Sequence, residues 1–457
     1  MSLSTPVKIK TLQRKLYTKA KQDPEFCFYV LYDKVSREDV LNHAYALVRS
    51  NGGAAGVDGR TIEQIEAQEG KEAFLATLGA TLRDKTYQAM PVRRIWIPKS
   101  DGSSRPLGIP TIKDRVVQTA VKLMIEPIFE AGFCEHSYGF RPKRTAHHAV
   151  DAVSMALHKR RYHVIDADLS KYFDTIPHAK LMSAVAERVS DGSILKLLKQ
   201  WFAASVIEED KSGVQRHHPA GGGKRCGTPQ GGVISPLLAN VYLHLLDRLW
   251  ERHDLSSRYN AELVRYADDM VICCGGNPDK PLQMLKMVLS RLGLSLNESK
   301  TRVVDARKEA FDFLGFSIRY RKSRVSGNWY PHVEPSERSF QRVKAKCRLL
   351  IHCRLTAMPL VQLMARLIRE LRGWCNYFHY RNSSGVLLGL KYFVEERVRD
   401  RMHRRFKLYS RVHALNVSQQ NGSLCFMPYQ QQQVGGRRMH WCEGYRKAVY
   451  GKTVHTD

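Results

Sequence analysis

Two adjacent aspartates beside an apolar run are the residues of this sequence best suited to chemistry. Asp268 and Asp269 separate the apolar stretches 263–264 and 270–272, so the pattern predicts a tight hairpin with two like charges on its turn. Such a pair is costly unless a cation offsets the repulsion. Asp168 lies near the end of another strand candidate. If the two strands lie side by side, three carboxylates converge.

Convergent carboxylate oxygens point to nucleotidyl transfer. They suit Mg²⁺, which prefers octahedral oxygen coordination and retains waters that a phosphate substrate can displace. Two such ions about 3.5–4 Å apart can activate a 3′-hydroxyl and stabilise the leaving pyrophosphate in an in-line displacement. The alternative is plain turn chemistry, because aspartate favours turns. Taken alone the pair fits that alternative better, but the rest of the chain favours catalysis.

The segments around the aspartates indicate an α+β fold. Residues 160–330 alternate between strand and helix patterns, which predicts an antiparallel sheet backed by helices. Residues 1–85 and the chain from residue 337 onward are expected to be helical, with an exposed Gly/Ala-rich loop at 51–59. Strands are expected at 163–169, 263–267, 270–274, 301–305 and 313–319.

Two further segments could approach a ligand. A hairpin with cationic side chains is expected over residues 92–110, with its turn at 99–102, and a helix should follow at 112–129. A Gly/Pro-rich loop at 227–236 opens an apolar helix at 237–246. Loops of this kind let the backbone approach a ligand closely.

The charge balance indicates a polyanionic partner. The chain has 73 Lys+Arg against 44 Asp+Glu, a net charge of +29. Residues 331–457 alone hold 23 basic and 8 acidic residues. A basic excess concentrated in this way suits nucleic acid.

Composition also bears on location and on the cysteines. No apolar run reaches the ~20 residues of a membrane span, so we expect no membrane partner and a cytoplasmic location. The first 22 residues hold six Lys/Arg and no acid, but a basic RNA-contacting helix explains this better than an organellar transit peptide. The ten cysteines form no CxxC repeat, so we expect reduced, mostly structural thiols without a zinc site or a disulfide framework.

Together these motifs resemble the reverse transcriptases encoded by bacterial and organellar group II introns, also called maturases. The resemblance runs from about residue 51 to about residue 410. Its strongest parts are Tyr-Ala-Asp-Asp at 266–269 and the strand end at 168–173. The other matching segments are 105–110, 137–142, 227–232 with 235–236, 313–316 and 372–378.

The resemblance implies a right-hand polymerase with fingers, a palm built on an antiparallel sheet, and a helical thumb. The first segment would be an N-terminal extension joined to the start of the fingers, and the last a basic tail that is a candidate DNA-binding element, with a solvated tail as the alternative. The implied boundaries are 1–85 for the extension, 86–160 for the fingers, 161–330 for the palm, 331–410 for the thumb or maturase domain, and 411–457 for the tail.

The resemblance also implies roles for individual residues. Asp168, Asp268 and Asp269 would be catalytic and would hold two Mg²⁺ ions, with the backbone carbonyl of Leu169 assisting. Residues expected at the incoming dNTP are Arg93, Lys99 and Arg105 near the triphosphate, Phe173 against a ribose 2′-hydroxyl, Gln230 beside the nascent base pair, and Lys300 as general acid for pyrophosphate. Primer and thumb contacts are expected from Phe313, Leu314, Gly315 and Trp374.

The expected function is therefore RNA-directed DNA synthesis for a mobile intron. The partners would be the intron RNA, an RNA template, a DNA primer or target, and dNTPs, with roles in splicing and retrohoming. Many relatives carry a Cys-rich H-N-H endonuclease after the thumb, but only Cys425 and Cys442 follow it here, so we expect none. Three alternatives remain: a maturase that acts only as an RNA-binding splicing cofactor, a domesticated, defence-associated or CRISPR-linked reverse transcriptase, and an RNA-dependent RNA polymerase.

Overall fold

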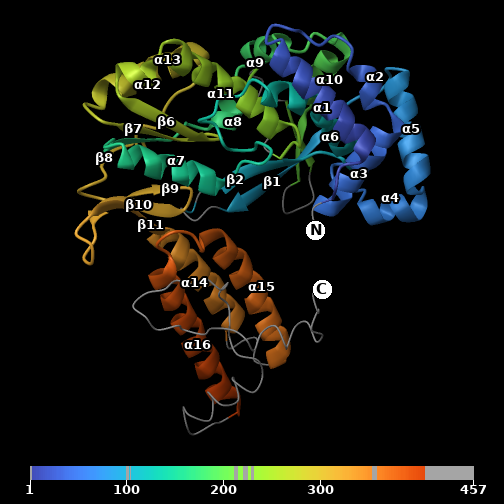
Figure 1. Cartoon of the computed structure of the whole chain (residues 1–457). Coiled ribbons are helices and arrows are strands. Elements are labelled where there is room, and N and C mark those ends of the chain that lie inside the picture. The colour runs from blue at the N-terminus through green and yellow to red at the C-terminus, as the bar shows by residue number, and fades with distance from the viewer. Residues whose placement is uncertain are drawn as a thin grey trace, which may run out of the picture. The chain divides into compact units, whose positions relative to one another are not determined.

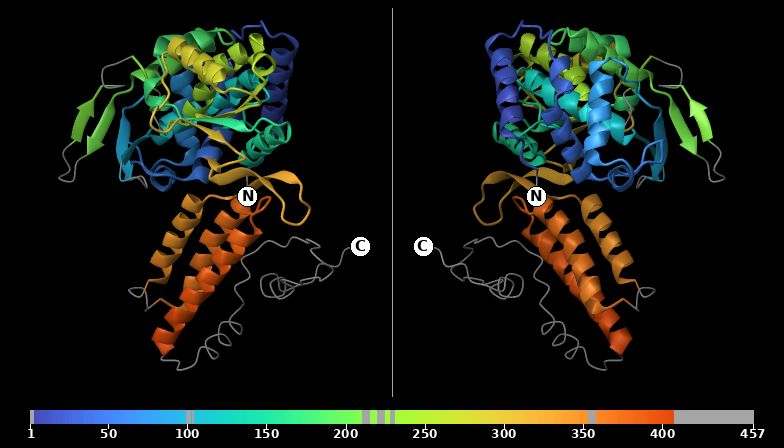
Figure 2. Two further views of the ribbon diagram at one scale, coloured as in Figure 1. Left: turned by 90° about the vertical axis from the view of Figure 1, so that its left-hand side faces the viewer. Right: turned by 90° about the vertical axis from the view of Figure 1, so that its right-hand side faces the viewer.

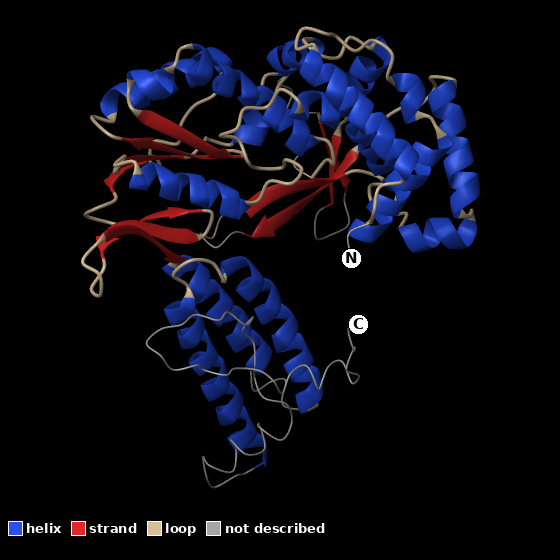
Figure 3. Cartoon of the chain, in the orientation of Figure 1, coloured by secondary structure: helices blue, strands red, loops and turns tan. Residues whose placement is uncertain are grey.

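The computed structural model divides the chain into two compact units, Met1–Val303 and Val304–Asp457. It describes residues 3–98, 102, 104–209, 215–219, 225–227, 231–352 and 358–406. Figure 1 labels the elements of both units, and Figure 3 shows that strands occur in each.

A buried helix organises the N-terminal part of the first unit. This helix, α6 (Ile112–Glu130), buries most of its side chains, polar ones such as Asp114 and Gln118 included, because other helices pack against it. Thr111 caps its start by accepting a hydrogen bond from the Asp114 backbone. The helices α1 and α3 pack against it. The helices that precede α6 are α1 (Val7–Gln22), α2 (Tyr32–Val35), α3 (Glu38–Asn51), α4 (Ile62–Gln68) and α5 (Lys71–Arg83).

The expected cationic hairpin is confirmed for its described residues. β1 (Val92–Pro98) pairs antiparallel with β2 (Ser104–Ile109), from Arg93 opposite Ile109 to Pro98 opposite Ser104. β4 (Val206–Glu209) adds parallel to β1, and β5 (Gln215–His218) adds antiparallel to β4. Figure 2 shows β4 and β5 standing beside this hairpin. The two outer strands were not expected from the sequence.

A second sheet of the first unit has the strand order β6-β7-β3-β8. Its strands are β3 (His163–Ala167), β6 (Ala261–Tyr266), β7 (Asp269–Cys274) and β8 (Arg302–Asp305). Figure 1 shows helices on both faces, α7 on one and α12 and α13 on the other. The helices between α6 and β8 in the chain are α7 (Ala146–His158), α8 (Tyr172–Thr175), α9 (His178–Ala186), α10 (Gly192–Ala203), α11 (Ser235–Arg252), α12 (Leu255–Arg258) and α13 (Asp279–Leu292).

In its described residues, the second unit joins a small sheet to three helices. Val343, Leu367 and Val394, one from each helix, belong to its own buried core. Its sheet has the order β11-β10-β9. Among the described helices of the whole chain, none is both long enough and apolar enough to cross a membrane. The elements are β9 (Phe311–Phe313), β10 (Phe316–Lys322), β11 (Trp329–Pro335), α14 (Glu337–Ile351), α15 (Leu360–Phe378) and α16 (Ser384–Phe406).

One expected strand is wrong as a continuous element. The run 313–319 is broken because Leu314 and Gly315 take left-handed backbone conformations, with φ of 52° and 82°, and form the turn between β9 and β10. A Cβ on Gly315 would lie 3.1 Å from Ser339 Oγ and 3.2 Å from Phe378 Cζ. Glycine is therefore required here by both conformation and space.

Gly315→Ala should destabilise the second unit by about 1–3 kcal/mol, because alanine in a left-handed conformation is strained and its methyl group meets two neighbours. Thermal and denaturant unfolding of the full chain measures the change. Gly373→Ala in α15 is the matched control. Nothing lies within 4 Å of its added Cβ, so it should be neutral or slightly stabilising. Equal unfolding midpoints for the two variants would contradict this explanation of the turn.

Candidate catalytic site

The two adjacent aspartates lie at the tip of a tight hairpin. Tyr266 on β6 pairs with Asp269 on β7, which leaves Ala267 and Asp268 as a two-residue turn. Ala267 has a φ of 58°, the left-handed conformation that such short turns use. A Cβ on Gly139 would lie only 2.3 Å from the Ala267 nitrogen. The catalytic turn therefore rests directly on a residue that must be glycine.

The strand register brings the third aspartate to the same place. β3 runs antiparallel to β7, and their last pair is Ala167 opposite Met270. Continued by one step, this register would set Asp168 opposite Asp269, and the charge of Asp168 does contribute to the raised pKa of Asp269. Directly opposed residues share a face of the sheet and hold their Cβ atoms about 4.5–5.5 Å apart. The convergence that the sequence left conditional is thus present in the backbone.

The electrostatics of the aspartates reflect this crowding. Burial and the charges of Asp268, Asp168 and Asp166 together raise the pKa of Asp269 to about 7, while Lys300 acts in the opposite direction. Although Asp269 is exposed as a residue, its carboxyl group loses hydration to the protein atoms around it. Burial and Asp168 likewise raise the pKa of Asp268, while Arg105 lowers it. A divalent cation would offset this repulsion.

The three carboxylates are not drawn into a tight cluster. Among the described residues, the one group of three metal-type donor atoms that all lie within 4.8 Å of one another is elsewhere, at Cys134, His136 and Glu251. The aspartate oxygens are therefore more widely spaced, as expected of like charges that repel.

Basic residues lie near the carboxylates, but only some of those expected at the dNTP are found there. Lys300 Nζ lies 3.4 Å from Asp168 Oδ2, and the charge of Arg105, on β2, is felt at Asp268. The charge of Arg93 instead affects Arg115. Burial is the larger cause of the lowered pKa of Arg115, and the positive charge of Arg93 lowers it further. Lys99 and Gln230 lie outside the described residues.

The backbone after Asp168 is fixed by the segment 295–297. Asn297 N donates to the Asp168 carbonyl at 2.8 Å, and Leu169 forms a bridge with Leu296. A leucine side chain has no donor atom, so only the backbone carbonyl of Leu169 could serve a metal ion; the side chain itself is buried. Phe173, in α8, is partly buried against the main core.

The expected primer and thumb residues meet within the second unit. Phe313 is buried, and the Leu314 carbonyl accepts a hydrogen bond from Tyr377 Oη at 3.0 Å. The Gly315 carbonyl accepts one from the Ser336 backbone at 2.9 Å. Trp374 lies on α15. Its ring packs against Phe378 with centroids 4.6 Å apart.

A buried arginine behind the turn escaped the sequence reasoning. Arg265 and Asp247 are both 0% exposed and form a bidentate ion pair, with Nε donating to Oδ1 at 2.9 Å. Arg265 Nη1 also donates to the Ala267 carbonyl at 3.0 Å and to Asn240 Oδ1 at 3.1 Å. Arg265 Nη2 donates to Ser137 Oγ at 2.7 Å. One guanidinium thus connects the catalytic turn to two other segments.

The same segments are also joined by further hydrogen bonds. Asn240 Nδ2 donates to the Gly139 carbonyl at 2.6 Å, so α11 holds the glycine on which the turn rests. Arg265 N donates to the His136 carbonyl and Tyr138 N donates to the Arg265 carbonyl. A signal for this network was present, since a charged residue in the apolar strand 261–266 requires a buried partner.

Asp247→Asn should lower the free energy of unfolding by about 3–5 kcal/mol, because it leaves the Arg265 charge buried without a counterion. Burial alone would raise the pKa of Asp247, but Arg265 and His136 outweigh burial and hold that pKa well below its ordinary value. Chemical denaturation measures the change. Arg248→Gln, at the next position, breaks only the half-exposed pair with Glu187 and should cost less than about 1 kcal/mol. Similar costs for both variants would contradict the central role of the buried pair.

Two protein-family models match this chain, and one of them covers the candidate catalytic site. Residues 97–318 match the family model described as reverse transcriptase (RNA-dependent DNA polymerase). Residues 340–417 match the maturase-specific domain of group II introns. The first match contains Asp168, Asp268 and Asp269.

Several curated proteins are similar over most of this chain. Protein YkfC of Escherichia coli (strain K12) is 33% identical over 368 residues, which cover 72% of this chain and 93% of that protein. The group II intron-encoded protein LtrA of Lactococcus lactis subsp. cremoris is 29% identical over 360 residues, or 65% of this chain and 57% of LtrA. An uncharacterized 91 kDa protein in the cob intron of Schizosaccharomyces pombe is 23% identical, covering 84% of this chain and 55% of its own length.

The chain therefore spans little more than half the length of the last two relatives. Among solved structures, a telomerase from Candida albicans aligns with 74% of this chain and 64% of its own, at a TM-score of 0.39 and 14% identity, a similarity too remote to carry an argument. Two domain models match this chain, and the bacterial relative YkfC is aligned with it over nearly the whole of that relative's length. This chain therefore belongs to the group II intron-encoded reverse transcriptases, metal-dependent right-hand polymerases that carry a maturase domain.

Proposed function

We propose that the chain synthesises DNA on an RNA template with two Mg²⁺ ions held by Asp168, Asp268 and Asp269, and that it binds the RNA of its own group II intron. The observation that supports the catalytic part is the register of β3 and β7, which ends with Ala167 opposite Met270 and so brings Asp168 to the end of the sheet where Asp269 lies. The donors fit the ion, because carboxylate oxygens suit Mg²⁺ and the mutual repulsion of the three acids favours a cation among them.

The ions and the chain have separate tasks in this proposal. Bound Mg²⁺ would activate the primer 3′-hydroxyl and offset charge on the leaving pyrophosphate. The carbonyl of Leu169 would assist Asp168, since the bridge to Leu296 keeps that backbone in place. Lys300, whose Nζ lies 3.4 Å from Asp168 Oδ2, would donate a proton to the leaving pyrophosphate. Arg105 would bind the triphosphate from the fingers hairpin.

The remaining assignments follow from the family and the sequence. We assign Lys99 and Arg93 to the triphosphate and Gln230 to the nascent base pair, and the segment 313–315 with Trp374 to the primer and thumb. The boundaries we propose are fingers 86–160, palm 161–330, thumb 331–410 and a tail 411–457. The partners would be the intron RNA, an RNA template, a DNA primer or target and dNTPs. The location would be the cytoplasm.

RNA binding has support that is independent of the carboxylates. The net charge of +29 suits a polyanion, and residues 340–417 match the maturase-specific domain. Assistance to splicing would depend on this basic surface rather than on metal chemistry. A protein that only assists splicing therefore remains the second candidate, and it differs from the first in what an aspartate substitution does.

Asp268→Asn should lower primer extension on an RNA template by about 10²- to 10³-fold, the scale reached by losing one preorganised electrostatic contact to a transition state. Extension with dNTPs and Mg²⁺ by the purified full chain measures it. Asp305→Asn is the matched control, because that carboxylate lies on the outer strand β8 and pairs with Arg307. It should retain activity.

The splicing assay separates the two candidates. Intron RNA splicing assisted by Asp268→Asn should equal that of the unmodified protein. Extension that persists in Asp268→Asn would refute the assignment of Asp268 as a catalytic residue. Absence of extension by the unmodified protein, together with assisted splicing, would instead make the splicing cofactor the better description.

Phe173→Val should raise incorporation of ribonucleotides relative to deoxyribonucleotides by about 10- to 100-fold, because a smaller apolar side chain leaves room for a 2′-hydroxyl. Single-nucleotide incorporation with paired dNTP and rNTP substrates measures the ratio. Tyr172→Phe keeps the neighbouring ring, loses only the hydrogen bond to the Ala239 carbonyl, and should leave the ratio unchanged. A ribonucleotide preference in the unmodified protein would instead favour an RNA-dependent RNA polymerase.

A further inference from the structure

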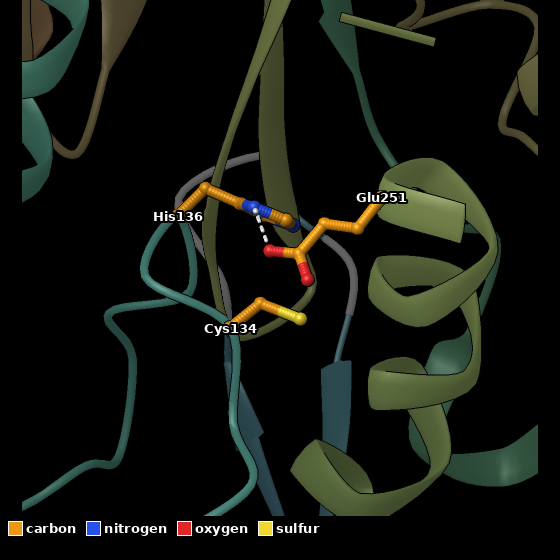
Figure 4. Close-up of side chains that lie close together, drawn as sticks. All are labelled: Cys134, His136 and Glu251. Atoms are coloured by element: carbon orange, nitrogen blue, oxygen red, sulfur yellow. Dashed lines mark ion pairs between the residues drawn. The ribbon is translucent and has the colours of Figure 1, made fainter. Parts of the chain in front are cut away.

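Three side chains from separate segments converge on the side of the first unit where the loop after α6 meets the end of α11. Cys134 and His136 lie in that loop, and Glu251 lies in the last turn of α11. Figure 4 shows the thiol, the imidazole and the carboxylate pointing toward one another. Their donor atoms all lie within 4.8 Å of one another. None of the three has a part in the polymerase chemistry proposed above.

The geometry of the imidazole suits a metal ligand. His136 Nδ1 lies 3.5 Å from Glu251 Oε1, on the side of the ring that faces the cluster. On the other side, Nε2 is buried without a hydrogen bond of good geometry, 3.4 Å from Asp247 Oδ1. A carboxylate behind the non-ligating nitrogen of a histidine is the usual way in which proteins orient a metal-binding imidazole.

The loop that carries two of the donors is held in place before any ion binds. Arg141 Nη1 donates to the carbonyls of Cys134 at 2.6 Å and Ser137 at 2.7 Å. Arg141 is itself fixed by Glu130, through Nε to Oε2 at 3.0 Å. The His136 carbonyl accepts from the Arg265 backbone at 2.9 Å. Because these hydrogen bonds already hold the loop in place, a bound ion would have to order less of the chain.

We propose that Cys134, His136 and Glu251 bind a zinc ion. A thiolate, an imidazole and a carboxylate form a three-ligand set that zinc accepts in tetrahedral geometry, with water as the fourth ligand. Cys134 is buried and Glu251 is exposed, so the fourth position would face solvent. Zinc fits better than Mg²⁺, because a thiolate is a soft ligand and Mg²⁺ requires oxygen.

The surrounding charges fit a cation. Two carboxylates, Asp247 and Glu251, lie near His136, and Glu251 is also close to Cys134. His244 Nδ1 lies 3.8 Å from Cys134 Sγ. Zinc binding would replace the thiol proton, which passes to solvent, and would balance the two carboxylates.

The site would be linked to the catalytic turn through a short chain of contacts. His136 faces Asp247, Asp247 is paired with Arg265, and Arg265 donates to the Ala267 carbonyl. Zinc would therefore fix the imidazole against the carboxylate that holds the arginine. Its role would be structural support of the turn rather than chemistry on the substrate.

Cobalt substitution in the metal-free full chain, prepared without a polyhistidine tag, tests the site. Co²⁺ should give a sulfur-to-cobalt charge-transfer band with one ion per chain, and Zn²⁺ should displace it. Cys134→Ser should abolish this band. Glu251→Gln, on the exposed ligand, should weaken Co²⁺ binding at least tenfold without changing the far-ultraviolet circular dichroism. Zinc should raise the unfolding temperature of the unmodified chain and not that of Cys134→Ser.

Two controls keep the result specific to this cluster. Cys27→Ser removes a thiol that donates to the Ala186 carbonyl elsewhere in the first unit and should leave the band intact. Asp268→Asn should also leave it intact, so that failure of the polymerase assignment and failure of the zinc site are distinguishable. Absence of the band in the unmodified chain, or an equal band in Cys134→Ser, would overturn the proposal. If Cys134→Ser does not fold, unchanged affinity in Glu251→Gln would overturn it as well.

Discussion

The ion pair between Arg265 and Asp247 is the interaction on which the geometry of the site depends. Both side chains are fully buried, so each charge is tolerable only in the presence of the other. Replacing such a pair by apolar residues often costs nothing in stability, and we therefore attribute its value here to position rather than to binding energy. The five guanidinium donors require a set of acceptors at fixed places, and one of these acceptors is the carbonyl of Ala267 in the catalytic turn.

This constraint explains how three repelling carboxylates can be held together. Asp268 and Asp269 have raised pKa values because burial and neighbouring acids disfavour their charged forms. A flexible turn would relax by moving them apart. Here the turn rests on Gly139 and is bonded to Arg265, and β7 is paired on both edges, with β6 and β3. The surrounding fold thus maintains an arrangement that is locally unfavourable, as active sites commonly require.

The sequence allowed the acidic residues to be predicted but not their supports. The Asp-Asp turn could be predicted because apolar runs flank the two acids. The hairpin at 92–110 could be predicted because turn-forming residues separate its two strands. The meeting of Asp168 with Asp269 depends on strand order and register over 100 residues, which local patterns do not encode.

Arg265 gave a signal as an isolated charge in a buried strand, yet its partner Asp247 lies on a helix whose apolar pattern hides it. Cys134, His136 and Glu251 have no regular spacing, so a search for CxxC repeats had to miss them. The break at Leu314 and Gly315 was missed because flanking phenylalanines continue the strand pattern.

The basic residues near the carboxylates must fit the site both without a metal ion and with one bound. Lys300 pairs with Asp168 at 3.4 Å and Arg302 with Asp166 at 3.2 Å. Lys300 is 60% exposed, and an exposed pair of this kind is weak. A divalent ion bound by Asp168 would therefore displace Lys300 at little cost. The freed ammonium group would then stand beside the metal, where the negative charge of a pyrophosphate is expected. Arg302 is held by Asp166, an acid outside the proposed ligand set, and need not move. The two ion pairs differ in this respect because only one of them uses an oxygen of the proposed ligand set.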